Sequence, residues 1–296
     1  MAVLEITWND PRALARALTL VESGTPEGQA LLRDAFPHTG QAFTLGVTGP
    51  PGSGKSSLIN RLLEETRQRW GPLAVLAIDP SSSFTGGALL GDRVRMQQHA
   101  GQPDVFIRSM ATRGQLGGLA AATADALLLL DAAGFRTIFL ETAGVGQNEI
   151  DVVGAADATL LVLAPGFGDA VQTLKAGILE IADVYVVNKA DRPEAEQTAR
   201  QLQEMLTLAE KTRQRPVILC SALEGRGVAE LMEVLAQLRG RKRPTRQAEL
   251  WRRRLRQLYC EQMLARLPEE ALERAAHEVA LRRANPYEIV ESWVRS

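Results

Sequence analysis

The sequence predicts an α/β fold in which a mostly parallel sheet of about seven strands is flanked by helices. One observation is that short apolar runs alternate with helical patterns between residues 43 and 238. Another is that polar, glycine-containing segments follow several of these runs, as they do at the carboxyl ends of parallel strands, where ligands bind. The expected strands are 43–48, 73–78, 105–108, 137–141, 159–163, 184–187 and 216–219.

Residues 1–40 are expected to form an N-terminal helical extension ahead of this sheet. The dipeptide Asp10-Pro11 is typical of the N-cap and the first position of a helix. Leu14 and Leu18 then begin an apolar helix face, and a second helix is expected after Thr25.

A phosphate-binding pattern, G-x-x-x-x-G-K-[ST], lies between the first strand and a helix. It is matched by Gly49, Pro50, Pro51, Gly52, Ser53, Gly54, Lys55 and Ser56. Glycines let backbone N–H groups approach phosphate oxygens, and the helix N-terminus adds partial positive charge. We expect Lys55 to reach the β- and γ-phosphates, Ser56 to ligate Mg²⁺, and Ser57 to complete the phosphate site. The fold over residues 41–240 is therefore predicted to be that of a P-loop NTPase.

Two aspartates follow the second strand, Asp79 at its end and Asp92 after a polar loop. Taken alone, Asp79 fits a helix cap as well as it fits a metal ligand. Together, two carboxylates downstream of a P-loop favour a switch segment that reaches Mg²⁺ and the γ-phosphate. Asp92 is therefore among the predicted catalytic residues, beside Lys55.

The fourth strand ends in Glu141-Thr142-Ala143-Gly144, which has glutamate where most P-loop GTPases have the aspartate of D-x-x-G. We expect Glu141 to lie near Mg²⁺ and to act in catalysis, and the N–H of Gly144 to meet the γ-phosphate. The next residue is Val145, so the water-orienting glutamine of small signalling GTPases is missing there, although Gln147 could replace it. The isolated protein is expected to hydrolyse its nucleotide slowly and to be stimulated by a partner.

A guanine signature, N-K-x-D, follows the strand at 184–187. It consists of Asn188, Lys189, Ala190 and Asp191. The Asp191 carboxylate can accept hydrogen bonds from guanine N1–H and from the exocyclic amine, a donor pair that adenine lacks. After the last strand, backbone groups are expected to meet guanine O6; they belong to Ser221, Ala222 and Leu223. GTP or GDP is therefore the expected ligand.

Composition argues against nucleic-acid and membrane partners. The chain of 296 residues has a formal net charge of −1, so it attracts neither polyanions nor anionic membranes. Its longest apolar runs are too short to span a bilayer, and no signal-peptide pattern opens it. Cys220 and Cys260 lie far apart and outside any metal-type spacing, which suits a reducing, cytoplasmic location.

Residues 241–296 are expected to form a C-terminal helical arm. Apolar side chains recur at helical spacing after Trp251, after Pro268 and after Pro286. These stripes make no compact core by themselves, so they must cover the main domain or another subunit. A dimerising arm is our hypothesis, and the basic run at 239–246 is expected to be a solvated linker and helix face.

The motifs occur within longer sequence blocks, at residues 16–22, 79–87, 91–96, 113–118, 141–149 and 188–191. The second block, for example, reads D-P-S-S-S-F-T-G-G. In this order the blocks resemble those of the MeaB/ArgK GTPases, and the likeness covers nearly the whole chain, more loosely after residue 240. Members of that family are chaperones of cobalamin-dependent mutases, and a human relative serves methylmalonyl-CoA mutase.

The resemblance implies a protein that uses GTP to gate transfer of adenosylcobalamin to an acyl-CoA mutase and to protect or reactivate that mutase. It implies a homodimer held by the C-terminal helices. It also implies that the loop at 168–175 is a further switch with catalytic Gln172 and Lys175, although the residues alone favour an ordinary first helical turn there. The Mg²⁺ ligands that it implies are Ser56, Asp79, Asp92 and Glu141.

Other functions remain alternatives. A metallocentre-assembly GTPase of the nickel-insertion type requires Cys and His ligands, but His38, His99 and His277 show no metal spacing with the two cysteines. A kinase or a transport ATPase on the same fold is disfavoured by N-K-x-D and by the lack of membrane segments. Small departures from the family pattern, such as Ala143 and Asn148, leave the identity of the mutase open.

Overall fold

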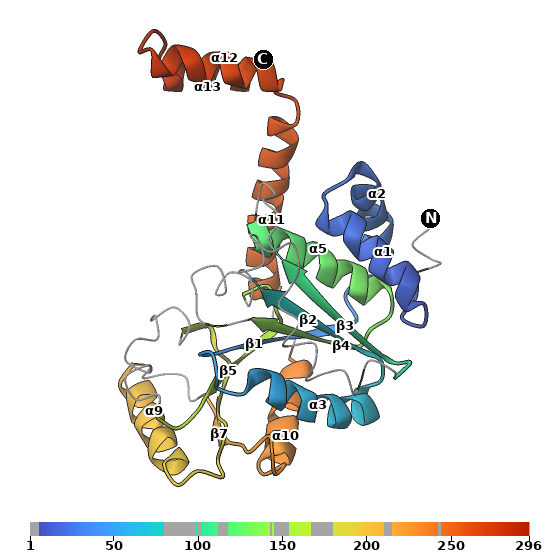
Figure 1. Cartoon of the computed structure of the whole chain (residues 1–296), viewed down its shortest axis with the longest axis vertical. Helices are drawn as coiled ribbons and strands as arrows, with labels where there is room; N and C mark the ends of the chain where they lie inside the picture. Colours follow the sequence, from blue (N-terminus) through green and yellow to red (C-terminus); the bar gives the residue numbers. More distant parts are fainter. Residues whose placement is uncertain are drawn as a thin grey trace. The chain divides into compact units, whose positions relative to one another are not determined.

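Our structure of the chain is a computed structural model that describes residues 6–79, 99, 102–111, 118–142, 144, 154–166, 180–209, 215–241 and 244–295. The chain divides into two units, Met1–Gln247 and Ala248–Ser296. The first unit contains the sheet and all of the predicted nucleotide motifs (Figure 1).

The seven described strands form one sheet in which every neighbouring pair is parallel, in the order β3-β2-β4-β1-β5-β6-β7. The strands are β1 (Phe43–Thr48), β2 (Leu73–Asp79), β3 (Val105–Ala111), β4 (Thr137–Thr142), β5 (Ala158–Leu163), β6 (Val184–Val187) and β7 (Val217–Leu219). This architecture confirms the predicted α/β fold. The third strand continues past its predicted end at 108 because residues 109–111 pair in register with residues 77–79 of β2.

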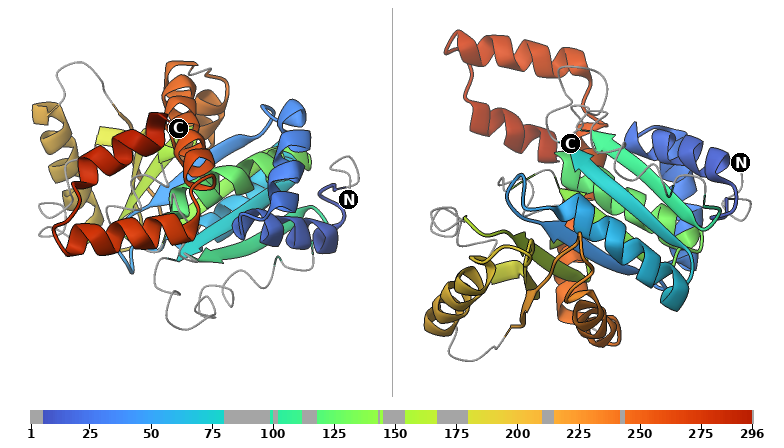
Figure 2. Two further views of the ribbon diagram at one scale, coloured as in Figure 1. Left: turned by 90° about the horizontal axis from the view of Figure 1, so that it is seen from above. Right: turned by 60° about the horizontal axis from the view of Figure 1, so that its bottom comes forward.

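Helices cover both faces of the sheet (Figures 1 and 2). Neighbouring residues of a strand point to opposite faces, so Phe139 of β4 joins one core cluster while Ile138 and Leu140 join the other. The first cluster includes residues of α3 (Lys55–Trp70) and α10 (Val228–Arg239), and the second includes residues of α1 (Pro11–Glu22), α2 (Pro26–Ala35) and α5 (Gly118–Ala132). A third joins α9 (Ala195–Ala209) to β5 and β6. Burial on both faces explains the nearly continuous apolar runs of the strands.

The two N-terminal helices begin where the sequence predicts. Asp10 Oδ1 accepts a hydrogen bond from the N–H of Ala13 at 2.9 Å, and Thr25 Oγ1 accepts one from the N–H of Gly28 at 3.1 Å. The short helix η2 (Phe36–His38) follows α2. Leu14 of α1 is completely buried in the cluster that includes α5, so the extension packs on the sheet domain.

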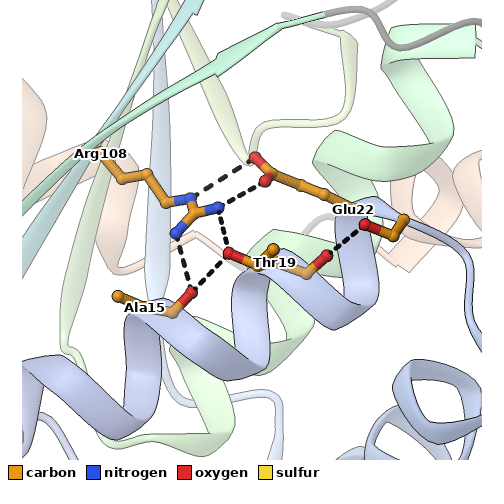
Figure 3. A network of polar contacts seen from close by, with 5 residues as sticks. Ala15, Thr19, Glu22 and Arg108 are labelled. Carbon is orange, nitrogen blue, oxygen red and sulfur yellow. Dashed lines mark hydrogen bonds and ion pairs between the residues drawn. The ribbon is translucent and has the colours of Figure 1, made fainter.

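Arg108 on the edge strand β3 joins the sheet to α1 (Figure 3). Its guanidinium donates to both carboxylate oxygens of Glu22, to the carbonyl oxygen of Ala15 at 2.9 Å and to Thr19 Oγ1 at 3.1 Å. The side chains of Arg108 and Glu22 are only 15% and 8% exposed. This largely buried network therefore holds the helical extension against the edge of the sheet.

The second unit contains most of α11 (Pro244–Leu264), together with α12 (Glu269–Ala280) and α13 (Pro286–Arg295). Neither α12 nor α13 contains a buried residue, and large apolar side chains such as Tyr259, Tyr287 and Val294 are exposed. None of the described helices has the length and hydropathy that crossing a bilayer requires.

We expect Arg108→Met to lower the free energy of unfolding by about 2–4 kcal/mol, because the Glu22 carboxylate then stays buried without its partner. Arg69→Met is the matched control, since Arg69 forms exposed ion pairs with Glu65 and Glu233 and its loss should change stability by less than about 1 kcal/mol. Urea unfolding followed by circular dichroism measures both variants. Small and equal changes would contradict a stabilising role for the Arg108 network.

Candidate functional site

The predicted motifs meet at one rim of the sheet, where the central strands have their carboxyl ends. β1 lies between β4 and β5, at the point where the strand order reverses. Ligands of open α/β sheets bind at such a switch point. The P-loop follows β1, Glu141 lies at the end of β4, and the N-K-x-D segment follows β6, so the rim collects all three.

Two positions of the P-loop can be occupied only by glycine. Gly49 has a φ of 144° and Gly54 a φ of 88°, values that L side chains rarely adopt. A Cβ at Gly49 would overlap the carbonyl oxygen of Val162 in β5, and a Cβ at Gly54 would overlap the side-chain amide of Asn188. The loop is therefore packed directly against a neighbouring strand and against the guanine signature.

Lys55 is the first residue of α3 and is only 6% exposed. Its Nζ donates hydrogen bonds to the carbonyl oxygens of Gly49 at 2.9 Å and Pro50 at 3.1 Å. The positive charge is thus held at the start of the loop, close to the N-terminus of a 16-residue helix. Both the ammonium and the helix dipole favour an anion at this place.

Ser56 and Glu141 bring two oxygen-bearing side chains together. Ser56 Oγ donates to Glu141 Oε1 at 2.6 Å, and the residues are 8% and 5% exposed. Asp79 ends β2, but its side chain is not among the described ones, and Asp92 lies outside the described residues. Of the predicted metal ligands, the structure therefore brings Ser56 and Glu141 into contact. Within the described residues, no group of three or more His, Cys, Asp or Glu side chains could hold a metal ion.

The side chain of Asn188 links three segments of the rim. Its Nδ2 donates to the P-loop carbonyl oxygens of Ser53 at 2.9 Å and Gly54 at 3.3 Å. Its Oδ1 accepts from the N–H of Ala222 at 3.1 Å. Asn188 is only 1% exposed, and buried amides of this kind need such partners. The phosphate loop and both guanine segments therefore form one hydrogen-bonded unit.

Lys189 and Asp191 add further hydrogen bonds to this unit, Lys189 to the P-loop and Asp191 to the segment that follows β7. Lys189 has a φ of 59°, and its Nζ donates to the carbonyl oxygen of Gly52 at 2.8 Å. Asp191 Oδ1 accepts from Ser221 Oγ at 2.8 Å, and Ser221 Oγ in turn accepts from the N–H of Glu224 at 3.2 Å. The Asp191 carboxylate is therefore oriented by the segment that follows β7.

Two titratable groups that follow β6 and β7, Asp191 and Cys220, have shifted pKa values. The hydrogen bond from Ser221 is the main cause that lowers the pKa of the Asp191 carboxyl below 3.8, helped by its own backbone N–H and by the charges of Arg192 and Lys189. Burial raises the pKa of the Cys220 thiol to about 12. Asp191 is thus an exposed, ionised acceptor, whereas Cys220 is a buried, neutral side chain.

The remaining predicted site residues differ in what the structure describes. Ser53 is completely buried, and its Oγ has no hydrogen-bond partner within the described part of the chain. Leu223, in the segment that follows β7, is 87% exposed. Gln172 and Lys175 lie outside the described residues, so their catalytic role stays a prediction.

Two buried threonines at the rim are absent from the predicted set. Thr48 Oγ1 donates to the carbonyl oxygen of Gly144 at 3.2 Å, and Thr142 Oγ1 donates to Thr48 Oγ1 at 3.1 Å. In the sequence they are marked by one feature: each is a threonine at the last position of a strand, next to the P-loop or within the E-x-x-G motif.

Comparison with known proteins identifies the family. Residues 14–278 match the family model described as methylmalonyl Co-A mutase-associated GTPase MeaB. A Pyrococcus abyssi protein named as a GTPase is 51% identical over 235 residues, which cover 78% of this chain and 72% of that protein. GTPase ArgK of Escherichia coli is 39% identical over 232 residues, which cover 75% of this chain and 70% of ArgK.

A crystal structure described as a LAO/AO transport system kinase shares the fold, with a TM-score of 0.65 at 24% identity over 99% of this chain and 95% of that one. The fold, the P-loop and the guanine signature agree with the sequence matches. The chain belongs to the MeaB family, and it is a P-loop GTPase.

Proposed function

We propose that this GTPase is a chaperone that gates adenosylcobalamin loading of a cobalamin-dependent acyl-CoA mutase and protects or reactivates that mutase. The family's description as mutase-associated supports the choice of client. The observation that carries the nucleotide part is the Asn188 side chain, which bonds both to the P-loop and to the segment after β7. A cytoplasmic setting suits the free cysteines Cys220 and Cys260.

In this proposal GTP lies across the rim, with its phosphates at the P-loop and its base at Asp191. The ionised carboxylate of Asp191 accepts hydrogen bonds from guanine N1–H and from the exocyclic amine. Water attacks the γ-phosphate in line with the bond to the leaving β-phosphate oxygen. Lys55 and the N–H groups of the loop stabilise the charge that develops on the phosphate oxygens.

Mg²⁺ is the metal that P-loop phosphate chemistry implies, and the donor set at the rim fits it. Ser56 and Glu141 offer hard oxygen ligands that are already within 2.6 Å of each other. They would hold the ion, with Asp79 and Asp92 as further predicted ligands. When bound, Mg²⁺ would neutralise charge on the β- and γ-phosphate oxygens.

Slow turnover of the isolated protein is part of the proposal. Val145 follows the E-x-x-G motif where a water-orienting glutamine would stand. The mutase would therefore supply or position the group that orients the attacking water, which the isolated site lacks. We also infer a homodimer through the C-terminal unit, where exposed Tyr259, Tyr287 and Val294 support an apolar interface.

We expect Asp191→Asn to weaken GDP and GTP binding by roughly 100-fold or more, because the new amide cannot accept both guanine donors. Affinity for xanthine nucleotides should rise in the same variant. Isothermal titration with GDP, XDP and ADP measures the effect, and Asp34→Asn, an exposed change on α2, is the matched control. Unchanged GDP affinity in Asp191→Asn would refute the guanine assignment.

Ser221→Ala should raise the pKa of Asp191 toward 3.8, because it removes the main cause of the lowered value. A lowered folded pKa means that the carboxylate persists at acidic pH and is lost as the pH falls through that pKa. In Ser221→Ala the loss therefore moves to higher pH. Carbon-13 NMR of the Asp191 carboxyl measures the midpoint, and the same midpoint in both proteins would contradict the role of Ser221.

The client proposal is tested by GTP turnover with and without a purified methylmalonyl-CoA mutase. We expect the mutase to raise kcat by about tenfold or more. Even a tenfold increase would be small beside the effect of an arginine finger supplied in trans. Lys55→Ala with the same mutase is the control and should stay inactive. Rapid turnover of the protein alone, unchanged by the mutase, would count against the proposal.

A further inference from the structure

Thr48 is the last residue of β1, and Thr142 is the last residue of the adjacent strand β4. The residues directly before them, Val47 and Glu141, are paired in the sheet, so the two threonines lie side by side. The two threonines are 0% and 1% exposed. Thr142 Oγ1 donates to Thr48 Oγ1 at 3.1 Å, and Thr48 Oγ1 donates to the carbonyl oxygen of Gly144 at 3.2 Å. Thr142 Oγ1 also lies 3.4 Å from that oxygen, so either hydroxyl can donate to it.

Buried hydroxyls at these positions need a reason. Apart from Glu141, the strand residues next to them, such as Val47 and Leu140, are apolar or glycine, and a valine would fill the same volume without a hydroxyl to desolvate. Removing a hydroxyl from water costs free energy unless a hydrogen bond offsets it. Here the hydrogen bonds to the carbonyl oxygen of Gly144 offset that cost. The two side chains therefore hold the backbone of the E-x-x-G motif at Gly144.

We propose that Thr48 and Thr142 are positioning residues that hold Gly144 of the E-x-x-G motif close to the P-loop and so tune the response to a γ-phosphate. Thr48 directly precedes Gly49, the first residue of the P-loop. The Thr48 hydroxyl therefore ties the carbonyl of Gly144 to the residue that precedes the P-loop. The inference deepens the proposed function and rests on it, because it requires GTP at this rim.

The two threonine hydroxyls should affect the binding of GTP but not that of GDP. In the proposed function, contacts to the α- and β-phosphates and to the base come from the P-loop, Lys55 and Asp191, whereas the hydrogen bonds that the two threonine hydroxyls donate go to each other and to Gly144. Only the γ-phosphate is expected to contact Gly144. Loss of a hydroxyl should therefore weaken GTP binding and hydrolysis while leaving GDP affinity unchanged.

The test compares Thr48→Val and Thr142→Val with Thr137→Val in the full-length protein. Thr137 is also fully buried on β4, but it lies at the opposite end of the strand, where its hydroxyl accepts from Arg239 Nη1 at 2.8 Å. Affinities for GDP and for a non-hydrolysable GTP analogue are measured by isothermal titration, and hydrolysis is measured in a single turnover.

We expect Thr48→Val to reduce the affinity for the GTP analogue relative to GDP, and the single-turnover rate, by roughly three- to tenfold each. Thr48→Ser should restore both, and Thr137→Val should change neither. Thr142→Val should act in the same direction as Thr48→Val, and the double variant should lose less than the sum because the hydroxyls form one chain. Thr142→Val also provides the test if Thr48→Val does not fold.

Unchanged affinity ratios and rates in both valine variants would overturn the inference, even if their melting temperatures fall, because the hydroxyls would then be structural only. Failure of the unmodified protein to bind either nucleotide would overturn the proposed function, and the inference with it.

Discussion

The rim of the sheet depends on the hydrogen bonds of the Asn188 side chain. The P-loop follows β1, whereas Asn188 follows β6, which lies two strands away in the sheet. Through Ser53, Gly54 and Ala222, one buried amide fixes the spacing between the P-loop, where we propose that phosphate binds, and the segments that we propose read the base. In the proposed binding mode a nucleotide spans both, and a spacing that exists before binding would reduce the entropy that binding costs.

The parallel sheet supplies the rigid base for this spacing. Apolar side chains on both faces of each central strand are buried under helices, so the strand ends have little freedom. Glycine at positions 49 and 54 lets the P-loop pass against β5 and Asn188, where any side chain would collide. Ser56 and Glu141 then meet at the start of α3, so two oxygen-bearing side chains lie beside a helix N-terminus, which favours phosphate.

The strands and the nucleotide motifs could be predicted because they depend on local patterns. Apolar runs of strand length, glycines with special backbone angles and the N-K-x-D signature are all visible within a few residues. The individual hydrogen bonds that join residues far apart in the sequence could not be predicted. Arg108 lies 86 residues from Glu22, Thr142 lies 94 from Thr48, and Asn188 lies 135 from Ser53. Tertiary packing alone brings those pairs together.

We propose that one rim of the sheet binds phosphate and guanine together, and a crystal structure with a non-hydrolysable GTP analogue and Mg²⁺ would show whether it does. We expect the triphosphate along residues 49–56, the metal on Ser56 and Glu141, and the guanine edge on the Asp191 carboxylate. A nucleotide bound elsewhere, or a base turned away from Asp191, would contradict it.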